Sequence, residues 1–246
     1  MMRNDTASSH AVLNLLHLNA CPIIIQLQLE EALLRSDLGN WCIINEGTPS
    51  PAIVMGISGR SDLLVNDSKW QKAPIPIIKR FSGGGTVVVD HNTFFVTFIC
   101  NSAELQVPCY PDKILKWTES FYQPIFSQVN FGLKENDYVI DDRKFGGNAQ
   151  YLTKNRWLHH SSLLWDFDAD NMEYLLFPPK TPAYRQQRSH ADFLCCLRPH
   201  LLKKALFTEK IISALSNFFH VNPVTMDETD SIINRPHRKT TTIIKR

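Results

Sequence analysis

The chain has 246 residues, of which 20 % are charged, and its formal net charge at pH 7 is +2. That length allows one large domain with a substantial core. The near balance of charge excludes a chain-wide basic surface of the kind that binds nucleic acid or an anionic membrane. We therefore expect neither a nucleic-acid nor a membrane partner, and any anion site must be local.

The cysteine pattern and the N-terminal residues indicate the compartment. The six cysteines show neither CxxC spacing nor the paired framework of small secreted domains, which favours reduced thiols. The first twenty residues lack the cationic and apolar regions of a secretory signal. No stretch approaches the ~20 apolar residues that span a bilayer. We expect an intracellular protein, in the cytoplasm or the mitochondrial matrix.

The first predicted elements alternate strand and helix. AVLNLLHL at 11–18 is typical of a short strand, and PIIIQLQLEEALLRSD at 22–37 is typical of an amphipathic helix. Pro22 suits the first helical turn, where its missing amide proton costs nothing. WCIINEG at 41–47 and AIVMGIS at 52–58 are β-rich runs separated by turn residues, so we expect two strands there.

A strand ending near Ile78 is followed by RFSGGG and then by two further β-rich runs. TVVV at 86–89 and TFFVTFI at 93–99 are joined across Asp90–Asn92, whose residue types tolerate tight-turn backbone angles. The pattern predicts a β-hairpin. The glycines would then lie at an edge or corner of a sheet.

The second half of the chain is again mixed. Residues 111–130 have helical spacing, with Pro124 expected to kink or restart the helix. Residues 138–152 indicate a second hairpin, 157–168 another strand and 204–221 the last clear helix. We therefore expect an α+β fold with mixed, largely antiparallel sheets flanked by helices.

Two glycine-bearing segments with cations are the candidates for chemistry, since phosphate-loop, dinucleotide and zinc patterns are absent. RFSGGG at 80–85 spends three residues without side chains directly before a buried strand, at a cost of roughly 0.5–1 kcal/mol each. A sheet corner is one explanation, and a ligand lying against the backbone is another. RKFGGNAQ at 143–150 is either an ordinary hairpin or a support for a buried Lys144.

Taken together, the two segments resemble the lipoate-protein ligase A family of the biotin and lipoate ligase superfamily. That family carries an arginine before Ser-Gly-Gly-Gly, then a lysine in K-x-x-G-x-A, then a histidine ahead of a leucine-rich strand. The matching residues are Arg80 with SGGGT at 82–86, Lys144 in KFGGNAQ, and HHSSLL at 159–164. LEEALLR at 29–35, PAIVMGIS at 51–58 and the stretch 135–144 add to a resemblance over about residues 10–220.

The resemblance implies a biotin/lipoyl ligase-like catalytic domain that activates lipoate with ATP. Lipoyl-AMP and pyrophosphate would form, and a lysine of an acceptor lipoyl domain would then displace AMP. Lys144 would be the catalytic residue, and Lys144 and His160 would bind lipoate. ATP and lipoyl-AMP would lie against Arg80, Ser82, Gly83, Gly84, Gly85, Thr86, Val87, Val88, Lys144, Gly147, Asn148 and Ala149.

Further expectations concern the metal, the partners and the domain limits. Mg²⁺ would accompany ATP, with Asp137 as a candidate ligand, while His160 could instead be a hydrogen-bonded core histidine. Acceptors would be lipoyl domains of 2-oxoacid dehydrogenase complexes or the glycine cleavage H protein, with an accessory protein as a further partner. The catalytic domain is expected over 1–221, followed by a polar tail at 222–246 with no accessory domain.

Two alternatives remain open from the sequence. The first is an octanoyl- or lipoyltransferase that uses an acyl-protein or preformed lipoyl-AMP, with Cys109 as the cysteine to test. The second is a non-catalytic subunit that binds lipoyl-AMP. Adding lipoate and an apo lipoyl domain with and without ATP would separate the three.

Overall fold

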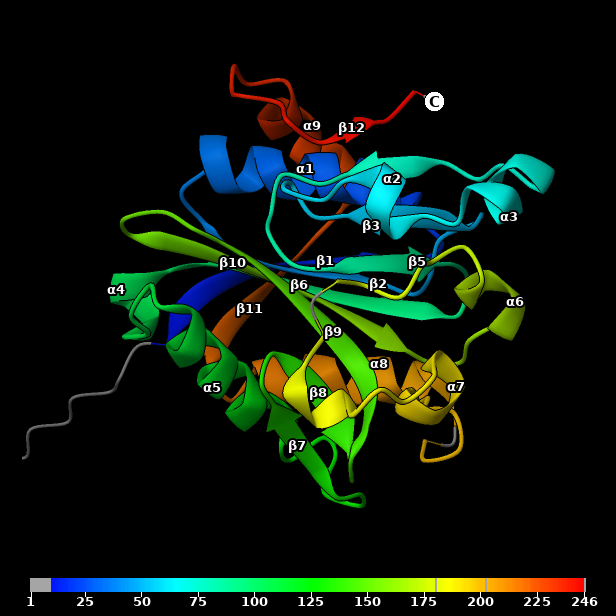
Figure 1. Cartoon of the computed structure of the whole chain (residues 1–246). Helices are drawn as coiled ribbons and strands as arrows, with labels where there is room; N and C mark the ends of the chain where they lie inside the picture. The colour runs from blue at the N-terminus through cyan, green and yellow to red at the C-terminus, as the bar shows by residue number, and fades with distance from the viewer. Residues whose placement is uncertain (1–9, 180, 202, 246) are drawn as a thin grey trace, which may run out of the picture.

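Two β-sheets build the protein, a large one and a small one (Figure 1). The structure is a computed structural model, and it describes residues 10–179, 181–201 and 203–245. The eight-stranded sheet has the order β11-β1-β2-β6-β10-β9-β8-β7. Its strands are β1 (Ala11–Leu18), β2 (Asn40–Asn45), β6 (Thr93–Asn101), β7 (Phe131–Lys134), β8 (Asp137–Ile140), β9 (Arg143–Leu152), β10 (Arg156–Leu164) and β11 (Phe219–Val224).

The four-stranded sheet has the order β12-β4-β3-β5. Its strands are β3 (Ala52–Met55), β4 (Ile77–Lys79), β5 (Thr86–Val89) and β12 (Thr242–Ile243). Strand β3 pairs in parallel with β4 and antiparallel with β5. The glycine segment connects β4 to β5, so it lies where the chain turns back to form the edge of this sheet.

The predicted hairpin of 86–89 and 93–99 is wrong, because the two runs belong to different sheets. Strand β5 pairs with β3, whereas β6 lies between β2 and β10. The tight turn between them does form, since Asp90 accepts a hydrogen bond at 3.1 Å from the Thr93 amide. Because each strand finds its partner elsewhere, the turn carries the chain from one sheet to the other.

Helices cover both faces of the large sheet (Figure 1). α5 (Pro111–Tyr122) and α8 (Lys204–Leu215) lie on one face. α1 (Ile23–Ser36), α9 (Met226–Ile233) and the small sheet lie on the other. Shorter elements are α2 (Ser61–Leu64), α3 (Asp67–Lys72), α4 (Ser102–Leu105), α6 (Ala169–Met172), the 3₁₀ turn η1 (Ala183–Arg185) and α7 (His190–Phe193).

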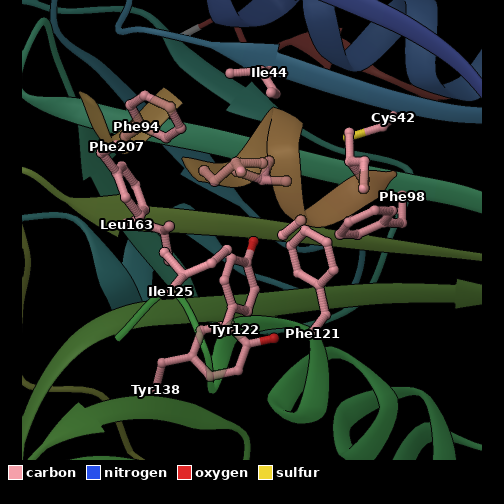
Figure 2. Packing of buried hydrophobic residues seen from close by; sticks show 14 of the residues in the cluster. Cys42, Ile44, Phe94, Phe98, Phe121, Tyr122, Ile125, Tyr138, Leu163 and Phe207 are labelled. Carbon is pink, nitrogen blue, oxygen red and sulfur yellow. The ribbon is translucent and has the colours of Figure 1, made fainter. Parts of the chain in front are cut away.

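The core is divided by the large sheet. On one face the rings of Phe98, Phe121 and Tyr122 pack edge to face, with centroids near 5 Å apart, as Figure 2 shows. On the other face Leu27 of α1 packs with Val54 of the small sheet and Phe95 of the large sheet. Helix α1 is therefore held between the two sheets. No helix in the described part of the chain is long and apolar enough to cross a membrane.

The C-terminal residues take part in this framework, and β11 runs across the boundary expected at residue 221. Strand β11 pairs with β1, and β12 pairs with β4. The amides of Thr240 and Thr241 donate to the buried Glu31 carboxylate of α1 at 2.9–3.1 Å. Burial raises the pKa of Glu31, but these hydrogen bonds outweigh it and leave the pKa below its ordinary value. The segment 222–245 therefore contributes strand pairs to both sheets and hydrogen bonds to α1.

The other predicted elements agree with the structure except at their ends. The helix expected over 111–130 ends at Tyr122, because Pro124 has no amide proton to continue the hydrogen-bond ladder. The last helix ends at Leu215 rather than 221, and the chain then enters β11. The hairpin at 138–152 forms as β8 and β9.

Candidate active site

A cavity of about 660 Å³ is lined by the edge strand β5, by β9 and β10 of the large sheet, and by residues within 172–179 and 181–194. Its size is within the range of small-molecule sites. Apolar side chains form much of its wall, among them Val54, Phe95, Leu164 and Phe193. The predicted site residues that line it are Arg80, Gly84, Gly85, Thr86, Val87, Val88, Asp137, Lys144, Gly147, Asn148, Ala149 and His160.

Arg80 holds the glycine loop together. Its Nη2 donates to the carbonyls of Gly83 at 2.7 Å and Gly85 at 2.9 Å, and its Nε donates to Gly83 at 3.2 Å. The residue is 4 % exposed, and burial lowers its pKa to about 10 against the opposing effect of the Glu30 carboxylate. These donors are engaged with the protein. A phosphate-binding role for Arg80 therefore stays a prediction, and the structure gives it a positioning role.

The three glycines of the loop have different reasons to be glycine. Gly84 has φ of +102°, and a Cβ there would lie 2.6 Å from Arg80 Nη2 and 3.5 Å from the Ala149 side chain. Gly84 is therefore required by its left-handed backbone, and a Cβ there would also displace the Arg80 guanidinium. A Cβ on Gly83 or Gly85 would meet nothing within 4 Å among the described residues. Of these two, Gly85 lines the cavity and leaves open space beside the backbone, whereas Gly83 does not line it.

Ser82 and Thr86 flank the glycines. Ser82 is 1 % exposed, and its carbonyl accepts a hydrogen bond from the Ile57 amide at 3.0 Å. This buried hydrogen bond holds the start of the loop in place. Thr86 lines the cavity, and its buried Oγ1 has no hydrogen-bond partner in the described part of the chain. A buried hydroxyl without a partner is costly, which makes Thr86 a candidate to contact a ligand.

Lys144 lies on β9 in the cavity wall. Its Nζ forms an ion pair with Asp137 Oδ1 at 2.8 Å, and its side chain is 23 % exposed. A Cβ on Gly147 would lie 3.3 Å from this Nζ, so the missing side chain at 147 leaves the ammonium uncovered on that side. Asp137 also accepts from the Tyr184 hydroxyl at 2.9 Å. The ammonium is thus held from one side and open to the cavity on another.

Asn148 lies between the two glycine segments and has both ends of its amide engaged. Its Nδ2 donates to the Asn136 carbonyl at 2.9 Å, and its Oδ1 accepts from Ser161 at 2.7 Å. The side chain therefore joins the turn before β8 to β10. These contacts support the hairpin, and the nucleotide contact expected of Asn148 stays a prediction.

His160 belongs to a buried polar network whose other members, Glu30 and Thr97, the sequence did not predict. Its Nδ1 lies 2.9 Å from Glu30 Oε1 and 3.0 Å from Thr97 Oγ1, and Thr97 donates to Glu30 at 2.7 Å. Glu30 is completely buried on α1. His160 also lines the cavity, so its network fixes a ring that faces the ligand space.

The Mg²⁺ expectation gains no ligand set from these residues. Both oxygens of Asp137 are engaged, by Lys144 and by Tyr184. No cluster of three His, Cys, Asp or Glu side chains that could hold a metal occurs in the described ranges. Cys109 packs against the core, and neither it nor any other described cysteine lines the cavity.

Two cavity-lining residues come from a region to which the sequence assigned no site, namely Arg185 of η1 and His190 of α7. Tyr184 of η1 contacts the cavity-lining Asp137. The Tyr184–Asp137 hydrogen bond spans 47 residues of sequence. No local motif marks these residues, so only the tertiary structure brings them to Lys144.

A family model for the lipoyl protein ligase A/B catalytic domain matches residues 22–220. The chain belongs to this family. Among curated relatives of this family, an "Inactive lipoate--protein ligase 2" of Plasmodium falciparum is 29 % identical over 82 % of this chain and 62 % of its own length. A probable lipoate-protein ligase A of Mycoplasma pneumoniae is 27 % identical over 72 % of this chain and 53 % of its own. The chain thus spans only about half to three fifths of these relatives.

Solved structures of lipoyl ligases show the same biotin/lipoyl ligase fold. A bi-partite lipoate protein ligase from Thermoplasma acidophilum, studied with its E2 lipoyl domain, has a TM-score of 0.74, with 18 % identity and 91 % of each chain covered. P. falciparum LipL1 in complex with lipoate gives 0.70, with 17 % identity over 91 % of this chain and 69 % of that one. A lipoate-protein ligase A bound with ATP gives 0.65, with 16 % identity over 91 % and 92 %.

Proposed function

We propose that the chain activates lipoate with ATP in this cavity and transfers the lipoyl group to a lysine of a lipoyl domain. The observation that carries the proposal is the placement of Lys144. Its ammonium is held by Asp137 at 2.8 Å, lies beside Gly147, and lines the same cavity as the glycine loop. A fixed cation beside an open backbone suits an acyl adenylate, which joins a carbonyl to a phosphate.

The two chemical steps make different demands on these residues. In the first, a carboxylate oxygen of lipoate attacks the α-phosphorus of ATP, and pyrophosphate leaves. In the second, a neutral lysine amine of the acceptor attacks the acyl carbon, the C–O bond to phosphate breaks, AMP leaves and the amine loses a proton. Both steps increase negative charge on oxygen, so a preoriented ammonium lowers both barriers.

The apolar wall supports lipoate as the acid. Val54, Phe95 and Leu164 line the cavity and offer hydrocarbon contact to an aliphatic chain. The structures of P. falciparum LipL1 with lipoate and of lipoate-protein ligase A with ATP support both substrates for this chain. The lipoyl-domain acceptor, with an accessory protein as a further partner, is supported by the bi-partite archaeal ligase and its E2 lipoyl domain.

A second candidate is a protein that binds the adenylate without transferring it, and the P. falciparum relative named inactive favours it. Intact-mass measurement of an apo lipoyl domain separates the two. The purified chain is incubated with lipoate, Mg²⁺ and ATP, or with supplied lipoyl-AMP. Mass gain with ATP supports the ligase, and mass gain from supplied lipoyl-AMP alone restricts the chain to transfer. Calorimetric binding of lipoyl-AMP without any mass gain supports the binding protein.

A further inference from the structure

The 3₁₀ turn η1 and the residues after it are hydrogen-bonded to strand β8 and to the turns on either side of it. Tyr184 donates to Asp137, and the Ala183 amide donates to Glu135 at 2.6 Å. Arg188 reaches back to Asp142 at 2.9 Å and donates to the Tyr184 carbonyl at 2.8 Å. The side chain that follows Tyr184 is therefore held at the cavity.

That side chain, Arg185, lines the cavity and is 4 % exposed. Its guanidinium lies over the ring of Phe177 at 4.4 Å and over that of Phe193 at 5.0 Å. Aromatic contact occupies the faces of a planar guanidinium and leaves its edge for hydrogen bonds. On that edge, Nε donates to the Arg188 carbonyl at 3.0 Å.

The Nη2 of Arg185 is buried and has no hydrogen-bond partner among the described residues. No carboxylate in the described ranges forms an ion pair with Arg185, whereas Lys144 and Arg188 each have one, in Asp137 and Asp142. A buried cationic donor without a partner is strongly disfavoured. Arg185 lines the cavity, so a ligand bound there is the partner available to its guanidinium.

Two cations and a tight left-handed turn surround this part of the cavity. Burial, Arg185 and Lys144 together lower the pKa of His190, which also lines the cavity, so the two cations act on one region. Gln186 and Gln187 have φ of +51° and +61°, a left-handed backbone that non-glycine residues adopt at a cost. The Arg188 amide and the Arg185 carbonyl close this turn at 3.0 Å.

We propose that Arg185 binds an oxyanion of the cavity's ligand, in plane with its guanidinium edge, and so acts as a specificity residue beside Lys144. The identity of the ligand rests on the function proposed above. Two sources share the chemistry, namely the carboxylate of free lipoate and the phosphate of the nucleotide. Arg80, the arginine expected for this role, has its Nε and Nη2 engaged by loop carbonyls.

Calorimetric titration of the full chain with lipoate, AMP and neutral lipoamide tests this. Arg185→Gln is expected to weaken binding of lipoate or of AMP by about tenfold to hundredfold, because a charged hydrogen bond is lost. Lipoamide affinity is expected to stay unchanged. The probe that weakens identifies the oxyanion. Arg198→Gln removes the same charge from a 70 % exposed side chain paired with Asp166 at 2.8 Å, and is the matched control.

Arg185→Lys covers the case in which the glutamine variant fails to fold. It keeps the charge but loses the planar fork, and is expected to weaken the same probe to a smaller extent. Equal affinity of the unchanged protein and the folded variants for lipoate and for AMP would overturn the role of Arg185 while leaving the proposed function intact. Failure of the unchanged protein to bind either probe would overturn both.

Discussion

Replacement of Lys144 by methionine should separate catalysis from stability. The side chain keeps its length and its apolar stem but loses the ammonium that faces the cavity. Its Nζ lies 2.8 Å from Asp137 Oδ1, and the substitution leaves this carboxylate, whose side chain is 8 % exposed, without its cation, at a cost of about 1–3 kcal/mol. For a chain of this size that corresponds to a fall in Tm of roughly 2–12 °C.

The effect on transfer should be much larger. Loss of one preoriented oxyanion donor typically lowers kcat by about 10²–10³-fold. The assay is single-turnover modification of an apo lipoyl domain from supplied lipoyl-AMP, followed by intact mass. Lys116→Met is the control, since Lys116 lies on α5, pairs with Glu119 at 2.6 Å, is 75 % exposed and does not line the cavity. Transfer by Lys144→Met at the rate of this control would refute the assignment.

The remaining predictions concern the loop, the Asp137 support and pH. Gly84→Val should lower Tm, because φ is +102° there, whereas Gly85→Ala should keep Tm and weaken lipoyl-AMP binding; the reverse order would favour a purely structural loop. Tyr184→Phe should slow transfer less than Lys144→Met does, and an unchanged rate would mean that Asp137 needs no help. Burial lowers the pKa of His159 to about 3, with a smaller effect from His160, so stability should fall as pH drops from 6.5 toward 3. Urea unfolding of His159→Gln should show a shallower decline over that range, and an equally steep one would assign the effect to other groups.

Periodicity was sufficient for the elements whose neighbours are fixed by burial. Residues 11–18 and 157–164 alternate or run apolar because both faces of the large sheet are covered, and α1 shows an apolar side toward each sheet. The pairing of strands could not be predicted in this way. The turn predicted at Asp90–Asn92 does form, but the residue types of a turn do not determine whether β5 pairs with β6 or with β3.

The site divides in the same way. Motifs identified the glycine loop and Lys144 because each is contiguous in sequence and chemically unusual. For Arg80 the motif did not reveal that the guanidinium is hydrogen-bonded to loop carbonyls, and its phosphate-binding role stays a prediction. Tyr184 and Arg185 could not be found from the sequence. The partner of Tyr184, Asp137, is 47 residues away in the chain and meets it only in the folded protein.

The position of β12 has a practical meaning for handling the protein. This strand pairs with β4 through Thr242 and Ile243, and β4 leads directly into Arg80 and the glycine loop. The preceding threonine amides tie the same segment to Glu31 of α1. A C-terminal affinity tag, or cleavage near the C-terminus by a protease, is therefore expected to disturb the glycine loop through β4 without contacting it. Weak binding or transfer in such a preparation would then reflect the altered C-terminus rather than the loop's own residues.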